Sequence, residues 1–426
     1  MQNIKAVKGY WHLQGLEDNR IAGILHYIPN EKIYLELIGA FEPPLDVLEA
    51  FAGESNKTTD LVLGEDQNGK KITLIKCRRS GSVNFSSSFA MNNYSVEYML
   101  YGIHLDSVED EKFHSATIKL PFLTEWVNQY MMRYSILYNI ENDVSGFEVS
   151  YDIKNHKEIS VPIKNGTSIR LSYSCSPPET LHNEKLKITQ HYELGIKQGA
   201  DKGFSSYKEI AERFKTFLSL ACLTDIDFIG IDLFNENYSQ DRKNGKKIFF
   251  PISLYWIQPN KLPQKDVAFN DFLFHYTDIE QEFENIITTW FSFNTEILPI
   301  LNHLINSIRT KRTFGSGDFL LVVQAIEGFH IRFRKEDKKS SFLKERMESL
   351  YSEFEFLTAI KRISFDFQEI VDSRNYYSHF FSRTDKYKIV EGVKLLYITQ
   401  NLKKLLICCV LRESGFNMKV LEKIIK

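Results

Sequence analysis

The sequence has few cysteines, and they are scattered along the chain. Five cysteines occur among 426 residues, and no two of them have the Cys-x-x-Cys spacing of a zinc or redox site. This distribution excludes a disulfide framework and is typical of a protein that folds in a reducing compartment. The five positions are Cys77, Cys175, Cys222, Cys408 and Cys409.

Long hydrophobic runs are also missing. The longest candidate, residues 395–411, is interrupted by Lys403 and Lys404, so we expect no segment to cross a membrane. The first five residues, MQNIK, lack the apolar core of a signal peptide. We therefore expect a soluble, cytoplasmic protein that has no membrane partner.

Neither sign of charge is in large excess. The chain has 53 Lys and Arg and 55 Asp and Glu, a formal net charge of −2, so any nucleic-acid binding must be local. Gly315-Ser316-Gly317 is not followed by the Gly-Lys-Ser/Thr of a phosphate-binding loop. His182 and His191 are too far from any cysteine to complete a ligand set. We expect neither a cofactor nor a metal.

The first part of the chain shows the period-two alternation of β-strands. Residues 33–37 and 169–173 are strand-like runs, and Asn68-Gly69 between residues 60–63 and 72–75 predicts a hairpin. We assign residues 1–204 to a β-rich domain. Residues 205–276 form a bridge with a helix at 207–223 and strands at 228–231 and 248–250, which we expect to complete the N-terminal sheet.

From residue 277 to 426 the apolar residues recur at helical spacing, which predicts an all-α bundle of four to six helices. Pro299 is expected to split the segment 278–308, and Asp318 is expected to cap the next helix. A later helix leads into residues 371–380, and a final long helix ends at Gly415. The predicted fold class is α+β, a β-rich domain followed by a helical bundle.

One stretch of this bundle carries chemistry. Residues 371–380, VDSRNYYSHF, combine a guanidinium, a carboxamide and an imidazole. On a helix that advances about 100° per residue, Asn375 and His379 share a face and Arg374 flanks it. Arginine binds phosphate oxygens and histidine transfers protons near neutral pH, so the trio suits a phosphodiester. The alternative is a salt-bridged helix surface near Asp372.

The spacing Arg374-Asn375-x-x-x-His379 resembles the RNxxxH signature of HEPN ribonucleases. The N-terminal stretches 9–13 and 21–25 resemble the opening of the ApeA N-terminal domain. The pairing of both parts is similar to the ApeA family of anti-phage defence proteins. The resemblance implies an endoribonuclease in which two bundles pair, so that both motifs line one cleft. We therefore expect a homodimer or a higher oligomer with a composite site.

The residue types also indicate a mechanism. RNA carries its own nucleophile, the 2′-hydroxyl, so a metal is not obligatory. His379 is expected to move a proton of the attacking or leaving oxygen, Arg374 to stabilise charge on the phosphorane, and Asn375 to hold the ring or the sugar. The expected products are a 2′,3′-cyclic phosphate and a 5′-hydroxyl.

Several residues are candidates for supporting roles. Glu327 resembles the acidic position on an early HEPN helix and is expected to orient Arg374, with a surface ion pair as the alternative. Tyr376 and Tyr377 are candidates for stacking on a base, with core packing as the alternative. A set of basic side chains is a candidate for contacting the RNA backbone, with a solvated face as the alternative: Arg309, Lys311, Arg312, Arg332, Arg334 and Arg383.

Two functions remain open at this stage. The first is an abortive-infection ribonuclease that cuts host or phage RNA, with tRNA as one candidate substrate. By analogy with the family, its N-terminal domain is the candidate for restraining the nuclease or for sensing infection, with a phage-derived molecule as a candidate trigger. The second is a HEPN-like scaffold or RNA-binding module that has no catalytic activity. Both rest on the resemblance, and they differ in whether His379 and Arg374 react.

Overall fold

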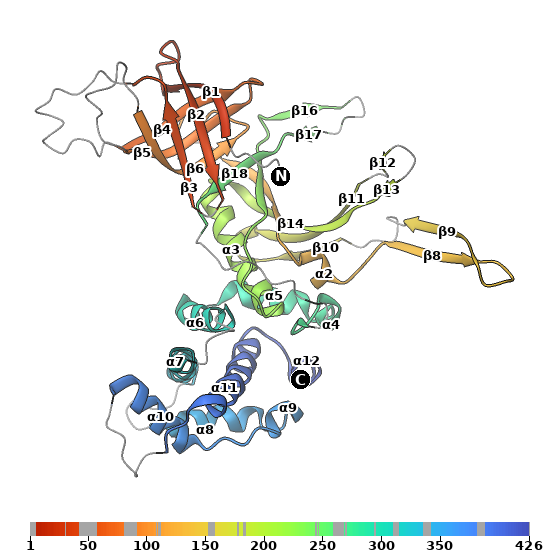
Figure 1. Cartoon of the computed structure of the whole chain (residues 1–426), viewed down its shortest axis with the longest axis vertical. Helices are drawn as coiled ribbons and strands as arrows, with labels where there is room; N and C mark the ends of the chain where they lie inside the picture. The colour runs from red at the N-terminus through yellow and green to blue at the C-terminus, as the bar shows by residue number, and fades with distance from the viewer. Residues whose placement is uncertain are drawn as a thin grey trace, which may run out of the picture.

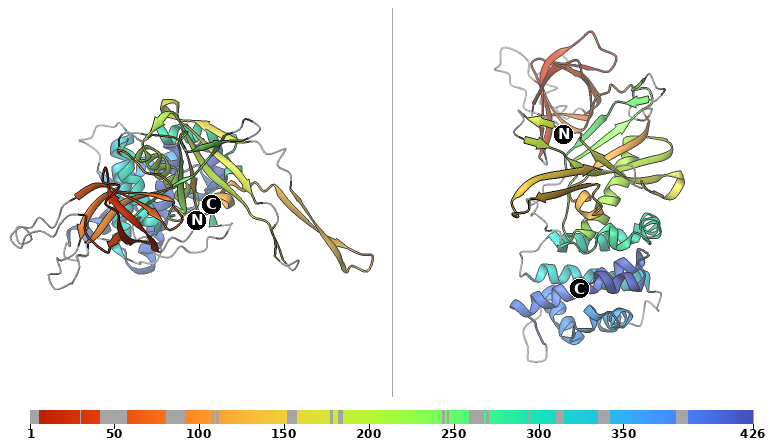
Figure 2. Two further views of the ribbon diagram at one scale, coloured as in Figure 1. Left: turned by 90° about the horizontal axis from the view of Figure 1, so that it is seen from above. Right: turned by 90° about the vertical axis from the view of Figure 1, so that its right-hand side faces the viewer.

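The computed structural model combines a β-rich part with a helical part (Figures 1 and 2). It describes residues 6–29, 31–41, 58–80, 92–107, 109, 112–151, 158–176, 179–181, 185–242, 245, 247–258, 268, 271–293, 295–309, 315–334, 342–380 and 388–425. The β-rich part lies at one end of the long axis and the helices lie at the other. The predicted α+β fold class is confirmed.

The first six strands form a closed antiparallel ring, in which β5 also pairs with β6. Trp11 is fully buried inside this barrel, and its ring occupies the space above Gly64. A Cβ atom at Gly64 would lie 2.2 Å from that ring, so only glycine fits there. The strands are β1 (Ala6–Leu13), β2 (Ile21–Ile28), β3 (Lys32–Leu37), β4 (Thr58–Asp66), β5 (Lys71–Ser80) and β6 (Asn92–Tyr101).

Beyond the barrel the sheet continues from β6 in the order β18, β15, β7, β14, β11 and β10. Helices α3 (Phe204–Ala221) and α2 (Leu123–Val127) pack against this sheet, and Trp126 and Phe217 meet edge to face between them. The six strands are β7 (Phe113–Lys119), β10 (Ile159–Pro162), β11 (Ser168–Cys175), β14 (Gln190–Lys202), β15 (Gly230–Phe234) and β18 (Ile252–Trp256), with the 3₁₀ turn η2 (Lys164–Gly166) between β10 and β11.

Three separate hairpins extend from this sheet: β8 (Met132–Tyr138) with β9 (Val144–Tyr151), β12 (Glu179–Leu181) with β13 (Lys185–Lys187), and β16 (Ser239–Asp241) with β17 (Lys247–Phe249). The β8–β9 hairpin projects furthest (Figure 1). Its cross-strand pairs Tyr134–Val149 and Ile136–Phe147 lie on one face. All four side chains are exposed, so the hairpin presents an apolar surface to solvent.

The helical part packs against α3. The indole nitrogen of Trp290 donates to the backbone oxygen of Arg213 on α3 at 3.0 Å, and the Trp290 ring lies 5.3 Å from Phe217. The elements are α4 (Tyr276–Ile279), α5 (Phe283–Ser292), η4 (Thr295–Ile297), α6 (Leu298–Arg309), α7 (Ser316–Phe333), α8 (Leu343–Phe354), α9 (Thr358–Lys361), α10 (Phe367–His379), α11 (Gly392–Glu413) and α12 (Met418–Ile424).

Most local expectations hold. The hairpin at Asn68-Gly69 is present, with Gly69 at φ +74°. The segment around Pro299 is split into α5 and α6, and Pro299 lies in the first turn of α6. The predicted cap at Asp318 is wrong, because Gly315 is the N-cap of α7 and the Asp318 carboxylate binds Lys403.

The prediction that residues 248–250 complete the large sheet is also wrong. Strand β17 pairs with β16, and β18 takes the place in the sheet between β15 and β6. Among the helices that the structure describes, none combines the length and the hydropathy that crossing a bilayer requires.

Candidate active site

Helix α10 carries the predicted motif and has well-defined ends. The Asp366 side chain caps it by accepting a hydrogen bond from the backbone nitrogen of Glu369 at 3.1 Å. This hydrogen bond, together with the Lys388 ammonium group 3.1 Å away, holds the pKa of Asp366 below its usual value. The helix ends at His379, because Phe380 adopts the left-handed conformation at φ 53°.

The three motif side chains lie together at the C-terminal end of α10. Arg374 Nη1 lies 3.3 Å from His379 Nε2 and 3.2 Å from Asn375 Oδ1. An arginine N–H can only donate, so His379 Nε2 acts as the acceptor in this contact. The Arg374 side chain is 25% exposed and His379 is exposed, so both groups reach solvent.

The sequence predicted that Asn375 holds the imidazole ring or the sugar. Within the described residues its carboxamide oxygen instead accepts from Arg374. Asn375 is therefore hydrogen-bonded to the guanidinium, and its expected contact with the ring or the sugar stays a prediction.

Glu327 on α7 lies between two arginines. Its Oε1 accepts from Arg346 Nη1 on α8 at 2.8 Å, and its Oε2 lies 3.8 Å from Arg374 Nη2. The three side chains are only 13–25% exposed, so the carboxylate interacts more strongly with both cations than it would in open water. Glu327 is thus placed to orient Arg374, whereas Arg346 had no signal in the sequence.

The segment that follows the motif is tied back to α10. The buried Asp372 carboxylate accepts from the backbone nitrogen of Lys388 at 3.1 Å and from Gln368 Nε2 at 2.9 Å. Ser373 Oγ accepts from the backbone nitrogen of Val390 at 2.9 Å. These bonds hold the entrance to α11 against the helix that carries the motif.

The two tyrosines of the motif pack against each other. Their ring centroids are 5.1 Å apart in an edge-to-face arrangement, and Tyr377 also meets Phe319 at 6.2 Å. The Tyr377 hydroxyl donates to the Val390 backbone oxygen at 2.8 Å. This geometry gives Tyr377 a packing role, and base stacking by Tyr376 stays a prediction.

Only some of the basic residues that were predicted to contact RNA are among the described residues. Lys311, Arg312 and Arg383 lie outside the described residues, and Arg309 is the last residue of α6. Arg332 donates to the Glu296 backbone oxygen.

Arg334 has a structural role. It contacts both Glu353 oxygens at 2.6 and 2.8 Å and Glu413 at 2.8 Å. These hydrogen bonds to Glu353 and Glu413 raise the pKa of Arg334 above its ordinary value.

No group of three or more His, Cys, Asp or Glu side chains lies close enough to hold a metal ion within the described ranges. What the site offers is a guanidinium and an imidazole in contact, with a carboxylate behind the guanidinium. A phosphate group is the natural ligand for such a pair.

Two family models match the chain. The model for ApeA N-terminal domain 1 matches residues 6–290, and the model for Apea-like HEPN matches residues 320–420, which include all three motif residues. Neither a curated protein nor a solved structure matches the chain. Because the first match covers more than half of the sequence, the chain belongs to the ApeA family, with ApeA N-terminal domain 1 followed by an Apea-like HEPN domain.

Proposed function

We propose that this protein is a metal-independent endoribonuclease of anti-phage defence. The observation that carries the proposal is the 3.3 Å contact between Arg374 and His379 at a solvent-accessible helix end, within the residues that match the Apea-like HEPN model. We assign the catalytic roles to Arg374 and His379, and a positioning role to Asn375 and Glu327.

The reaction we propose uses the 2′-hydroxyl of the RNA as nucleophile. A phosphate arriving at the site competes for the Arg374 N–H that now contacts His379, because a charged oxygen accepts more strongly than a neutral imidazole. His379 Nε2 is then available to accept the 2′-hydroxyl proton. The 2′-oxygen bonds to phosphorus, the P–O5′ bond breaks, and Arg374 stabilises the phosphorane between these steps.

The 5′-oxygen must receive a proton as it leaves, and one imidazole cannot easily be base and acid in the same step. We therefore propose a composite site in which two copies each supply Arg374 and His379. Val393 and Tyr397 support this proposal. They lie one turn apart on α11 and are 60% and 62% exposed, as expected of residues that meet a second bundle.

In the cell we propose that cleavage occurs in the cytoplasm and arrests growth during infection, with tRNA as one candidate substrate. Residues 1–204, joined by the bridge 205–276, then form the sensor and regulatory part that responds to a phage-derived trigger. Residues 277–426 form the ribonuclease domain.

Expression in cells tests this proposal. Expression of the wild-type protein is expected to slow cell growth, either without phage or only after phage infection. His379→Ala and Arg374→Ala are expected to be harmless in both conditions. Arg362→Ala, which removes an exposed cation outside the site, is the matched control and should behave as the wild type. Sequencing of RNA ends should show cuts with the wild type alone. Equal harmlessness of all four proteins, with and without phage, would favour the scaffold or RNA-binding function instead.

A further inference from the structure

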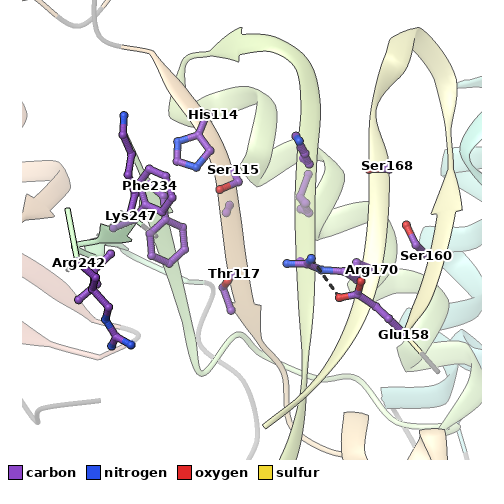
Figure 3. Close-up of a pocket in the computed structure, with 16 residues that line it drawn as sticks. His114, Ser115, Thr117, Glu158, Ser160, Ser168, Arg170, Phe234, Arg242 and Lys247 are labelled. Carbon is purple, nitrogen blue, oxygen red and sulfur yellow. Dashed lines mark ion pairs between the residues drawn. The ribbon is translucent and has the colours of Figure 1, made fainter. Parts of the chain in front are cut away.

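The large sheet has one open face. Helix α3 packs against β7 and β14, and on β7 the residues Ala116 and Ile118 are buried while Ser115 and Thr117 are only half-buried. Because successive side chains of a strand point to opposite faces, Ser115 and Thr117 lie on the face away from α3. A cavity of about 710 Å³ lies over this face (Figure 3).

The cavity is rich in cations. Arg170 lines it and pairs with Glu158 at 3.0 Å. Lys197, Arg242 and Lys247 line it as well, and within the described part of the chain none of these three makes an ion pair. Among the described lining residues the cations therefore outnumber the carboxylates by three, although the net charge of the whole chain is −2. Such a local excess attracts an anionic ligand.

Aromatic rings lie next to these cations. The His114 ring lies 4.6 Å from Phe249 and 6.5 Å from Phe234, and all three residues line the cavity half-buried. Figure 3 shows His114 and Phe234 on the same side as Arg242 and Lys247, with Ser115 and Thr117 between them and the Arg170–Glu158 pair. Rings beside cations suit a ligand that has both planar bases and phosphates.

The shape favours a polymer over a single nucleotide. The lining residues come from β10, β11, β14, β7 and β15, which are consecutive strands of the sheet, and from the β16–β17 hairpin. Neighbouring strands are about 4.8 Å apart, so the cavity crosses roughly 19 Å of sheet before it reaches the hairpin. Cations occur along this path, on β11, on the middle strand β14 and on the hairpin.

We propose that this elongated cavity, which we call the groove, binds a segment of single-stranded RNA. Its phosphates contact Lys197, Arg242 and Lys247. Its bases stack on the aromatic side chains that line the cavity next to the β16–β17 hairpin. The hydroxyls of Ser115 and Thr117 lie on the floor, where they can hydrogen-bond to ribose 2′-hydroxyls. The choice of RNA rests on the proposed ribonuclease function, to which the groove adds a second, non-catalytic contact with the substrate.

Binding of a fluorescein-labelled 12-nucleotide single-stranded RNA to the full-length protein tests the proposal. All proteins carry His379→Ala, so that the probe stays intact. The test variant adds Lys197→Gln, Arg242→Gln and Lys247→Gln. The control variant instead adds Lys8→Gln, Arg133→Gln and Lys361→Gln, which remove the same charge from exposed positions outside the cavity.

The slope of log affinity against log salt concentration is the main readout. Each phosphate contact on a single strand contributes about 0.7 to this slope, so the test variant should lose roughly 2. Phe249→Ala should weaken binding by roughly fivefold or more at every salt concentration, because a stacked base is lost. The control variant should bind as its parent does.

An unchanged affinity and slope in the test variant would overturn the proposal. Complete displacement of the probe by a mononucleotide at the same concentration as the protein would also overturn it, in favour of a small-nucleotide pocket. The outcome is separate from that of the ribonuclease proposal. Wild-type protein that binds through the groove but cuts nothing contradicts only the catalytic function, and cleavage that is indifferent to the groove contradicts only this inference.

Discussion

The carboxylate of Glu327 on α7 lies 3.8 Å from the guanidinium of Arg374 on α10, while it also holds Arg346 of α8 at 2.8 Å. Three helices therefore meet at one carboxylate behind the proposed catalytic arginine. Arg374 is thus linked to two further helices, to α7 directly and to α8 through Glu327.

Glu327→Gln should lower the rate of RNA cleavage without abolishing it. The substitution removes the charge that orients Arg374, an interaction worth about 1 kcal/mol or roughly fivefold in rate. Single-turnover cleavage measures the effect. Glu348→Gln, which removes an exposed carboxylate from α8, is the control and should leave the rate unchanged. Equal cleavage rates for Glu327→Gln and the wild type would contradict the positioning role of Glu327.

The cap of α10 should make its stability depend on pH. Asp366→Ala removes the cap and should destabilise the helix by about 1 kcal/mol at pH 7. Since the pKa of Asp366 is lowered in the folded protein, its charged form stabilises the fold above the ordinary pKa of about 4. This contribution is lost as the pH falls through the lowered value.

Hydrogen exchange of the α10 amides at pH 7 and at pH 3 measures this difference. The difference in amide protection between the wild type and Asp366→Ala should be smaller at pH 3 than at pH 7. Asp366→Asn keeps a capping side chain that does not titrate, so its stability should depend less on pH than that of the wild type. A gap that is the same at both pH values contradicts the role of the charge.

Ser373→Ala should loosen the segment that follows the motif. Ser373 and Val390 are buried, and the substitution leaves the Val390 N–H without its acceptor, a cost of about 1–3 kcal/mol. Faster hydrogen exchange at residues 388–391 is the expected sign. Ser352→Ala, at an exposed serine whose hydroxyl donates to the Ser349 backbone oxygen of the same helix, should have no such effect.

Lys403→Met should destabilise the helical part strongly. Lys403 donates to the Asp318 carboxylate at 2.7 Å, and their side chains are only 17% and 9% exposed. Removal of one partner leaves a buried charge, at a cost of roughly 3 kcal/mol. The double variant Asp318→Asn/Lys403→Met should regain part of the lost thermal stability. A double variant that is no more stable than Lys403→Met would contradict this explanation.

The features that the sequence predicts correctly are those set by the spacing of neighbouring residues. The motif on one helix, the hairpin at Asn68-Gly69 and the break before Pro299 all follow from residues that are close in sequence. Contacts between distant residues have no such signal: Arg346 reaches Glu327 across 19 positions and Lys403 reaches Asp318 across 85.

The error at Asp318 has the same cause. Asp318 follows a Gly-Ser-Gly stretch, which suggested a helix cap. Its carboxylate instead forms an ion pair with a lysine from another helix. Likewise, the closure of the barrel by β5 and β6 and the groove over β7 depend on strand pairing that the alternation of residues does not specify.

The most direct test of the account is the chemistry of the cut. Purified wild-type protein, His379→Ala and Arg374→Ala are incubated with RNA in the presence of EDTA, and the ends of the products are analysed. We expect 2′,3′-cyclic phosphate and 5′-hydroxyl ends from the wild type and intact RNA from both variants. Undiminished cleavage by His379→Ala, or wild-type cleavage that EDTA abolishes, would contradict it.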